Sequence, residues 1–402
     1  RATVVGGATN LQRCVVASAL PAWLSLLPRC YPTLLSPSSS PIPGAPPPTL
    51  LQIVLSEACA LAGRMSRAAR HPLLSALIGG SCDYHLLVRR ASLELWPHAV
   101  TSLDEADATH LSWQLVVLSH RLVDPSSPDA AASVATRRGL LALVAASAMC
   151  LPETSASRLL APLGTTLNNP AKHFHKPKQA ATIGSPSCDE DTSMPNLHVA
   201  IELLEALADR APPIPPRDAR GSNQQQLDAA EAVATEKLRS LRVAFDHIGA
   251  TSWLTSLSTA TGRHSSAFST LTLRGITALL KLLPQKSVPE AVHTSLPAML
   301  CRSLTNTPPL SCEDTEAELL NACVAAAEKT IGWMSSSQCA AVLTAATKLL
   351  SPAGGPPQPL RSIALPPNHN NEPPTSAASK ATSAATGRID TCLLSMCSLV
   401  TT

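Results

Sequence analysis

The sequence is poor in aromatic residues: Phe, Tyr and Trp make up 2% of the 402 residues, with only 3 Phe and 2 Tyr. Strands favour aromatic and β-branched side chains, whereas helices favour Ala and Leu. The hydrophobic content of 45% is supplied chiefly by Leu, Ala and Val. This composition argues against a β-sandwich or a β-barrel and predicts an all-α protein.

The sequence also lacks a strong charge imbalance and a long apolar run. Its formal net charge is +3, which is too small to attract nucleic acid or an anionic membrane from a distance. The longest run of apolar and small residues, 139–151, is too short to cross a bilayer. We therefore expect no direct nucleic-acid binding and no membrane insertion, and we interpret residues 139–151 as a buried core helix.

The sequence motifs that mark common enzymes are missing. There is no glycine-rich phosphate loop, no Gly-x-Ser-x-Gly elbow and no His-Glu-x-x-His motif. The one grouping that resembles a metal site is His173, His175, Cys188 and Asp189, and its spacing does not match a zinc site. We therefore predict a protein that is not an enzyme and has no cofactor and no metal site.

The 12 cysteines include no Cys-x-x-Cys pair, and no Asn heads a glycosylation sequon. Cys59, Cys150 and Cys323 lie in apolar helical segments and are expected to be small buried hydrophobic residues. Scattered cysteines fit a reducing compartment, which predicts an intracellular protein of the nucleus or cytoplasm. An organelle is the alternative, because no acidic residue precedes Glu57. Since the chain begins at Arg1, we expect a fragment of a longer protein.

Proline-rich stretches divide the chain, because proline interrupts helices. Many of the 36 Pro fall in four segments. The expected organisation is an N-terminal helix in 1–35, a Pro/Ser-rich linker at 36–48, helical repeats at 49–167, a disordered insertion at 168–195, helical repeats at 196–350 with a Pro-rich loop at 211–225, a disordered linker at 351–383, and a terminal helix in 384–402.

Apolar residues recur at helical spacing between these linkers. In the expected helix 49–67, for example, seven apolar residues share one face: Leu51, Val54, Leu55, Ala58, Leu61, Ala62 and Met65. Most consecutive helices are separated by short loops, which makes them antiparallel neighbours. Two-helix units of about 40 residues are typical of HEAT and armadillo arrays. We therefore predict a HEAT/ARM-like α-solenoid of antiparallel helix pairs, with an irregular globular helical domain as the alternative.

Two adjacent basic pairs are the candidate partner-binding residues: Arg89 with Arg90, and Arg137 with Arg138. They lie in helices of neighbouring expected units, and on a shared concave face they would suit an acidic partner. Ordinary helix-surface charge is the alternative. In the same segment, Leu86 is expected on the core face of its helix, together with Leu87 and Leu93.

Three segments resemble helices of the importin-β superfamily, in particular its transportin-SR and importin-thirteen-like branch. They are Gly139–Pro152, Val88–Leu95 and Leu238–Phe245. The resemblance implies a nuclear transport receptor whose partners are a small GTPase, Ran, and protein cargo. The long Pro/Ser-rich insertions and the scarcity of Phe and Tyr depart from that family.

The predicted function is thus a protein-binding scaffold, and the resemblance narrows it to a nuclear import receptor. Two alternatives stay open. One is a cytoskeletal or chromatin-associated HEAT-repeat assembly subunit, and the other is an accessory helical region of a larger enzyme.

Overall fold

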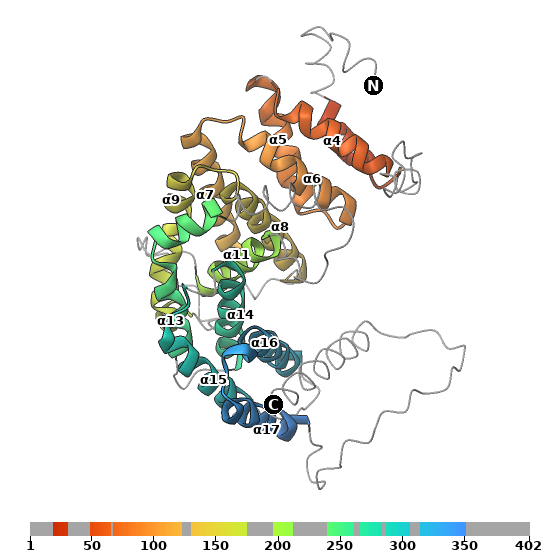
Figure 1. The fold of residues 1–402 in the computed structure, drawn as a ribbon. Helices are drawn as coiled ribbons and strands as arrows, with labels where there is room; N and C mark the ends of the chain where they lie inside the picture. Colours follow the sequence, from red (N-terminus) through yellow and green to blue (C-terminus); the bar gives the residue numbers. More distant parts are fainter. Residues whose placement is uncertain are drawn as a thin grey trace, which may run out of the picture. The chain divides into compact units, whose positions relative to one another are not determined.

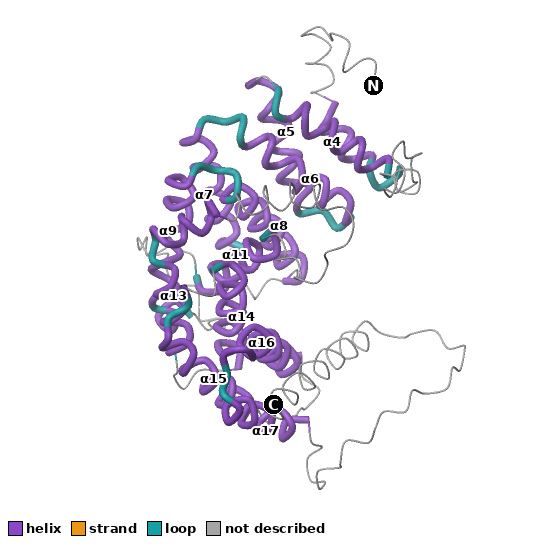
Figure 2. Tube along the Cα trace, viewed as in Figure 1, coloured by secondary structure: helices purple, strands orange, loops and turns teal. Residues whose placement is uncertain are grey.

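The computed structural model describes residues 19–30, 49–65, 67–122, 130–174, 196–211, 239–260, 266–283, 287–305 and 314–350. These residues are mostly helical and include no β-strand (Figures 1 and 2), which confirms the all-α prediction. The chain divides into two compact units: residues 1–166 with 175–250 form unit 1, and residues 167–174 with 251–402 form unit 2.

Unit 1 contains most of the labelled helices of the first half of the chain. Residues 19–26 and 239–247 are also helical. The labelled helices are α4 (Leu50–Ala62), α5 (Arg67–Ser81), α6 (Leu86–Val100), α7 (Glu105–Arg121), α8 (Ala130–Ala148), α9 (Glu153–Asn168), whose last residues belong to unit 2, and α11 (Leu197–Arg210).

Local sequence explains where several of these helices begin and end. Thr49 and Gln52 form a reciprocal capping box at the start of α4. The side chain of Asn196 accepts a hydrogen bond from the backbone N–H of Val199 and so caps α11. Gly249, after the helix at 239–247, has φ 67°, a left-handed conformation in which glycine is favoured at helix ends.

Helix α8 is the centre of unit 1. It packs against α5, α6, α7 and α11, while α6 packs against α4, α5 and α8. Leu140, Leu141, Leu143 and Val144 are all buried, as expected for the core helix predicted at 139–151. The buried indole N–H of Trp96 on α6 donates to Ser147 Oγ on α8 at 2.9 Å, which satisfies a polar group that would otherwise be stranded in the core.

Glycine allows α5 and α8 to approach closely. A Cβ at Gly139 would overlap the carbonyl oxygen of Ser81 and lie 2.9 Å from its carbonyl carbon. Nearby, Cys82 Sγ donates to the Thr136 carbonyl at 3.7 Å. The end of α5 is therefore held against the turn of α8 that carries residues 136–139.

In unit 2, helices pack on their second neighbours along the chain, and α15 also packs on the helix that follows it. Helix α14 packs on α16, and α15 packs on both α16 and α17. The ring of Phe174 meets that of Phe268 edge-on at 5.1 Å between centroids, and Ser295 Oγ donates to Ser258 Oγ at 2.9 Å. The elements are α10 (Pro170–His173), α13 (Ala250–Thr259), whose first residue belongs to unit 1, α14 (Ser266–Leu282), α15 (Glu290–Thr305), α16 (Asp314–Thr330), η3 (Ile331–Trp333) and α17 (Ser336–Leu350).

The structure differs from the sequence-based boundaries in three places. The helix expected at 49–67 ends at Ala62, and residue 67 already starts α5. Residues 168–174, expected in the disordered insertion, include the end of α9 and the short helix α10. Helix α11 belongs to unit 1, because it packs on α7 and α8. Four expected segments lie wholly or almost wholly outside the described residues. They are the linkers at 36–48 and 351–383, the terminal helix in 384–402, and the loop at 211–225, of which only residue 211 is described.

Candidate interaction surface

The connection between α5 and α6 is a short, heavily hydrogen-bonded corner. Asp83 Oδ1 accepts from the backbone N–H of His85 at 2.7 Å, and His85 Nδ1 accepts from that of Leu87 at 3.3 Å. Arg89 donates from Nε and Nη2 to the Asp83 carbonyl at 3.2 and 2.8 Å. With the contact between Cys82 and Thr136, these bonds fix the backbone of residues 82–89. We call the exposed side chains Tyr84, Leu86 and Arg90, carried by this backbone, the α6 corner.

The α6 corner exposes apolar side chains to solvent. Tyr84 is 82% exposed and Leu86 is 73% exposed, the highest values among the exposed large hydrophobic residues in the described part of the chain. The prediction that Leu86 lies on the core face of its helix was therefore wrong. The buried face of α6 contains Val88, Leu95 and Trp96 instead, because α4, α5 and α8 pack on that side.

The four candidate arginines lie in four different environments. Arg89 clamps the corner by its bonds to Asp83. Arg90 is exposed and forms an i,i+4 ion pair with Glu94, in which Nε and Oε1 are 2.8 Å apart. Arg138 is exposed on the turn of α8 that contacts the end of α5. These three keep a guanidinium at or near the surface of unit 1.

Arg137 does not belong to this surface, which corrects its prediction as a partner-binding residue. Its side chain is 8% exposed and forms a two-bond ion pair with Glu202, whose side chain is 6% exposed. The distances are 2.6 Å from Nε to Oε2 and 2.8 Å from Nη2 to Oε1. The pair joins α8 to α11 inside unit 1, so Arg137 has a structural role.

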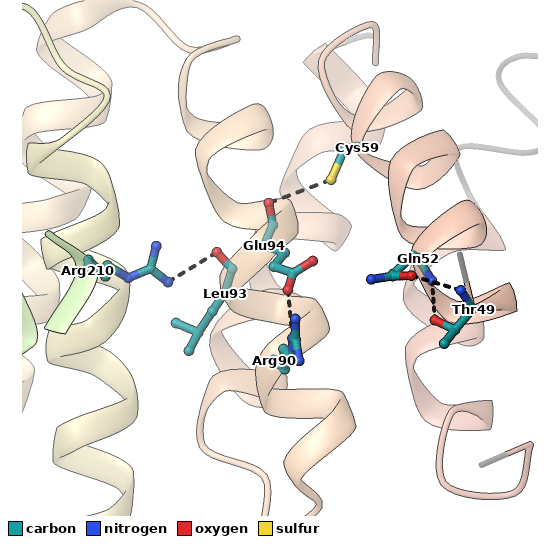
Figure 3. Close-up of polar contacts among 7 residues, drawn as sticks. All are labelled: Thr49, Gln52, Cys59, Arg90, Leu93, Glu94 and Arg210. Atoms are coloured by element: carbon teal, nitrogen blue, oxygen red, sulfur yellow. Dashed lines mark hydrogen bonds and ion pairs between the residues drawn. The ribbon is translucent and has the colours of Figure 1, made fainter. Parts of the chain in front are cut away.

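A proline within α6 creates an acceptor for a neighbouring helix. Pro97 has no N–H, so the Leu93 carbonyl lacks its usual partner four residues later. Arg210 at the end of α11 donates to this carbonyl from Nη2 at 3.3 Å. On the next residue, the Glu94 carbonyl accepts from Cys59 Sγ of α4 at 3.7 Å. Figure 3 shows Arg210 and Cys59 approaching this part of α6 from opposite sides, so α6 is tied to both α4 and α11.

None of the described cysteines forms a disulfide, and burial raises the pKa of several of their thiols. Burial, with a smaller contribution from the charge of Glu94, raises the pKa of Cys59 to about 11. Burial alone raises the pKa of Cys323 to about 12. Cys323 is buried, as predicted, whereas Cys59 and Cys150 are half-buried. Because the thiolate is the reactive form, Cys59 and Cys323 are weak nucleophiles at neutral pH.

No group of three or more His, Cys, Asp or Glu side chains placed to hold a metal ion occurs within the described residues. Of the metal-like grouping in the sequence, His173 lies in α10, and His175, Cys188 and Asp189 lie outside the described part. Among the helices that the structure describes, none combines the length and the apolar character needed to cross a membrane.

The described part of the chain thus defines an all-α protein with an exposed apolar and basic corner on α6. Comparison with protein-family models and with curated proteins finds no match for this chain.

Sequence reasoning selected four arginines for their charge and missed Tyr84 and Leu86; the four are Arg89, Arg90, Arg137 and Arg138. One pattern in the sequence was available. Leu86, Arg90, Glu94 and His98 recur every four residues, which places them on one side of α6. Because three of these four are polar, the stripe indicates a solvent-facing side, and Leu86 belongs to it.

Proposed function

We propose that the chain is a non-enzymatic, protein-binding scaffold built as a HEAT/ARM-like α-solenoid. The observation that carries the proposal is the packing of alternate helices. In unit 1, α4 packs on α6 and α6 on α8, and in unit 2, α14 packs on α16 and α15 on α17. Such second-neighbour contacts are those of stacked helix pairs, in which each repeat contacts its neighbours.

A stack of this kind leaves one solvent-facing stripe on many of its helices. On α6 this stripe contains Leu86, Arg90, Glu94 and His98, and exposed residues also occur on α4 and α11, such as Gln52 and Asp209. Side chains from successive repeats form an extended surface suited to a large partner. Surface complementarity, and not a chemical step, is the proposed mechanism.

Hydrogen exchange measured by mass spectrometry tests the stacked architecture. Leu207 on α11 and Leu55 on α4 are both buried, and truncating such a residue costs about 2–5 kcal/mol. In a stack, Leu207→Ala should speed exchange in α7 and α8 more than in α4 and α5, and Leu55→Ala should do the reverse. Equal acceleration in all helices of unit 1 by both variants would instead indicate a single common core.

Photo-crosslinking in cells tests protein binding. A photoreactive amino acid replaces, one at a time, the exposed residues Gln52, Glu94 and Asp209, with the buried Leu207 as the matched control. We expect crosslinks to a specific protein from at least one exposed position and none from Leu207. Failure of every exposed position to capture a protein would contradict the scaffold function.

A narrower proposal is that the scaffold is a nuclear import receptor for Ran and cargo. It is supported only by the resemblance of Gly139–Pro152, Val88–Leu95 and Leu238–Phe245 to the importin-β superfamily. Pull-down with Ran loaded with GTP, compared with Ran loaded with GDP, tests it. Preferential capture of the GTP form is expected, and equal or absent capture leaves the general scaffold without the transport role.

A further inference from the structure

Helix α6 contains a sequence motif that the proposed scaffold function leaves unexplained. Residues Arg89–Leu93 read Arg-Arg-Ala-Ser-Leu. Two arginines three and two residues before a serine, with an apolar residue after it, form the charge pattern by which basophilic protein kinases select a substrate. Carboxylates of such a kinase bind the guanidinium groups in charge-assisted hydrogen bonds. The other Arg-Arg pair of the sequence, at 137–138, has no Ser or Thr two residues later, so the complete pattern occurs once.

The hydroxyl group of Ser92 in this motif is buried and unsatisfied. Ser92 is 0% exposed, and its Oγ has no hydrogen-bond partner among the described residues. Other buried serines of unit 1, such as Ser112 and Ser119, donate to the carbonyl four residues earlier. A buried hydroxyl without a partner costs stability, so the packing of α6 does not itself require a serine at this position.

Ser92 lies against Gly80 at the end of α5, and the contact leaves no room for a larger group. A Cβ at Gly80 would overlap Ser92 Oγ and would lie 3.3 Å from Val88 Cγ1. A phosphoserine adds three oxygens and about −1.5 to −2 units of charge, and burying such a charge without a partner is very unfavourable. Phosphorylation of Ser92 and the packing of α5 on α6 therefore exclude each other.

The contact that covers Ser92 can open locally. Gly79 and Gly80 follow each other in the last turn of α5, and glycine weakens a helix because it gains conformational freedom when the helix opens. The ion pair of Arg90 with Glu94 is exposed and contributes little to stability. Local openings need less free energy than global unfolding. Unwinding of the first half of α6 exposes Ser92 and frees both arginines of the motif together.

We propose that Ser92 is a cryptic phosphorylation site: a basophilic serine/threonine kinase modifies it when α6 opens from α5, and the phosphate then prevents the contact from re-forming. In this step an aspartate of the kinase accepts the hydroxyl proton, Ser92 Oγ bonds to the γ-phosphorus of ATP, and the bond from that phosphorus to ADP breaks. The site is independent of the scaffold function. The modification converts a transient opening within unit 1 into a lasting one.

Phosphorylation of the full chain tests the site, with the catalytic subunit of cyclic-AMP-dependent protein kinase, Mg²⁺ and ATP, followed by mass spectrometry of the peptides. In Gly80→Val the added side chain meets Ser92 and Val88, which should open the contact and speed phosphorylation of Ser92 at least about tenfold. Gly79→Val is the matched control, because a Cβ at Gly79 meets nothing within 4 Å, and its rate should equal that of the parent chain. Adding Arg90→Gln to Gly80→Val should slow the reaction at least about tenfold, because it removes a guanidinium that the kinase binds.

Hydrogen exchange of the same samples measures the opening. Exchange in α5 and α6 should be faster after phosphorylation than in the same chain before the reaction, while exchange in unit 2 stays unchanged. Leu77→Ala, which truncates a fully buried residue of α5, is a second opening variant in case Gly80→Val loses its helical circular dichroism. Three results overturn the proposal: no phosphate on Ser92 in either opening variant, equal rates in Gly79→Val and Gly80→Val, or unchanged exchange in α5 and α6 after phosphorylation.

Discussion

The buried ion pair between Arg137 and Glu202 gives the sharpest test of how α8 holds α11. Its two bonds, at 2.6 and 2.8 Å, join side chains that are 8% and 6% exposed. At an effective dielectric constant of about 20 and a charge separation of about 4 Å, the attraction is about 4 kcal/mol. Removing one member also leaves the other charge buried and unpaired. Arg137→Met and Glu202→Leu should therefore each destabilise unit 1 by about 3–5 kcal/mol.

The double variant Arg137→Met/Glu202→Leu should behave differently. It removes both charges and fills the space with apolar side chains of similar size, and such replacements are neutral or stabilising by about 1–4 kcal/mol. The double-mutant cycle should thus give a coupling energy larger than either single effect. As a matched control, Arg90→Met breaks the exposed pair with Glu94 and should cost less than about 1 kcal/mol.

Hydrogen exchange followed by mass spectrometry is the appropriate assay, since it reports the opening free energy of α8 and α11 separately from unit 2. We expect both helices to lose protection in each single variant and to regain it in the double variant. The reasoning is refuted if Arg137→Met costs no more than Arg90→Met, or if the double variant is as unstable as the single ones.

Three further predictions follow from the packing and the thiols. Gly139→Ala places a Cβ against a backbone carbonyl of α5 and should lower the free energy of unfolding, measured by urea titration, by about 1–3 kcal/mol. Gly332→Ala is the control, because a Cβ there has nothing within 4 Å, and it should leave the stability unchanged. Equal urea midpoints for the two variants would contradict the close approach of α5 and α8. Arg210→Ala should lower the free energy of unfolding by about 1–3 kcal/mol. The loss should be smaller in a Pro97→Ala background, because the restored N–H of residue 97 donates to the Leu93 carbonyl that Arg210 otherwise satisfies. A loss of the same size in both backgrounds would show that Pro97 is irrelevant. The pKa of Cys59 is raised from 9.0 to about 11, so at pH 8 this thiol should react with iodoacetamide roughly 100-fold more slowly than an ordinary thiol. Mass spectrometry of the alkylated native protein measures the rate. The pKa of Cys59 is higher in the folded chain than in the unfolded chain, so the contribution of this thiol to stability is lost as pH rises from about 9 towards 11. Half-maximal alkylation of Cys59 near pH 9 would disprove the raised pKa.

Composition was enough to predict the class of fold. Leu and Ala at helical spacing, with few aromatic residues, do not suit a sheet, and no strand occurs in the described part of the chain. The start of α4 is set by a local signal, the capping box of Thr49 and Gln52, which the prediction from sequence did not use. The end of α4 at Ala62 and the start of α5 at residue 67 were not predicted. The apolar pattern of α4 continues to Met65, which is buried although it lies beyond the end of the helix.

The site depended on contacts that sequence spacing does not contain. Arg137 and Arg138 are adjacent, yet one is buried and the other is exposed, because consecutive residues of a helix point about 100° apart. What buries Arg137 is Glu202, 65 residues later, brought there by the packing of α11 on α8. Leu86 was assigned to the core because its side chain is apolar. The helices that pack on α6 lie on the side of α6 opposite Leu86. Local sequence therefore determined that helices form and nearly where, while only the tertiary structure decided which face of each helix meets solvent.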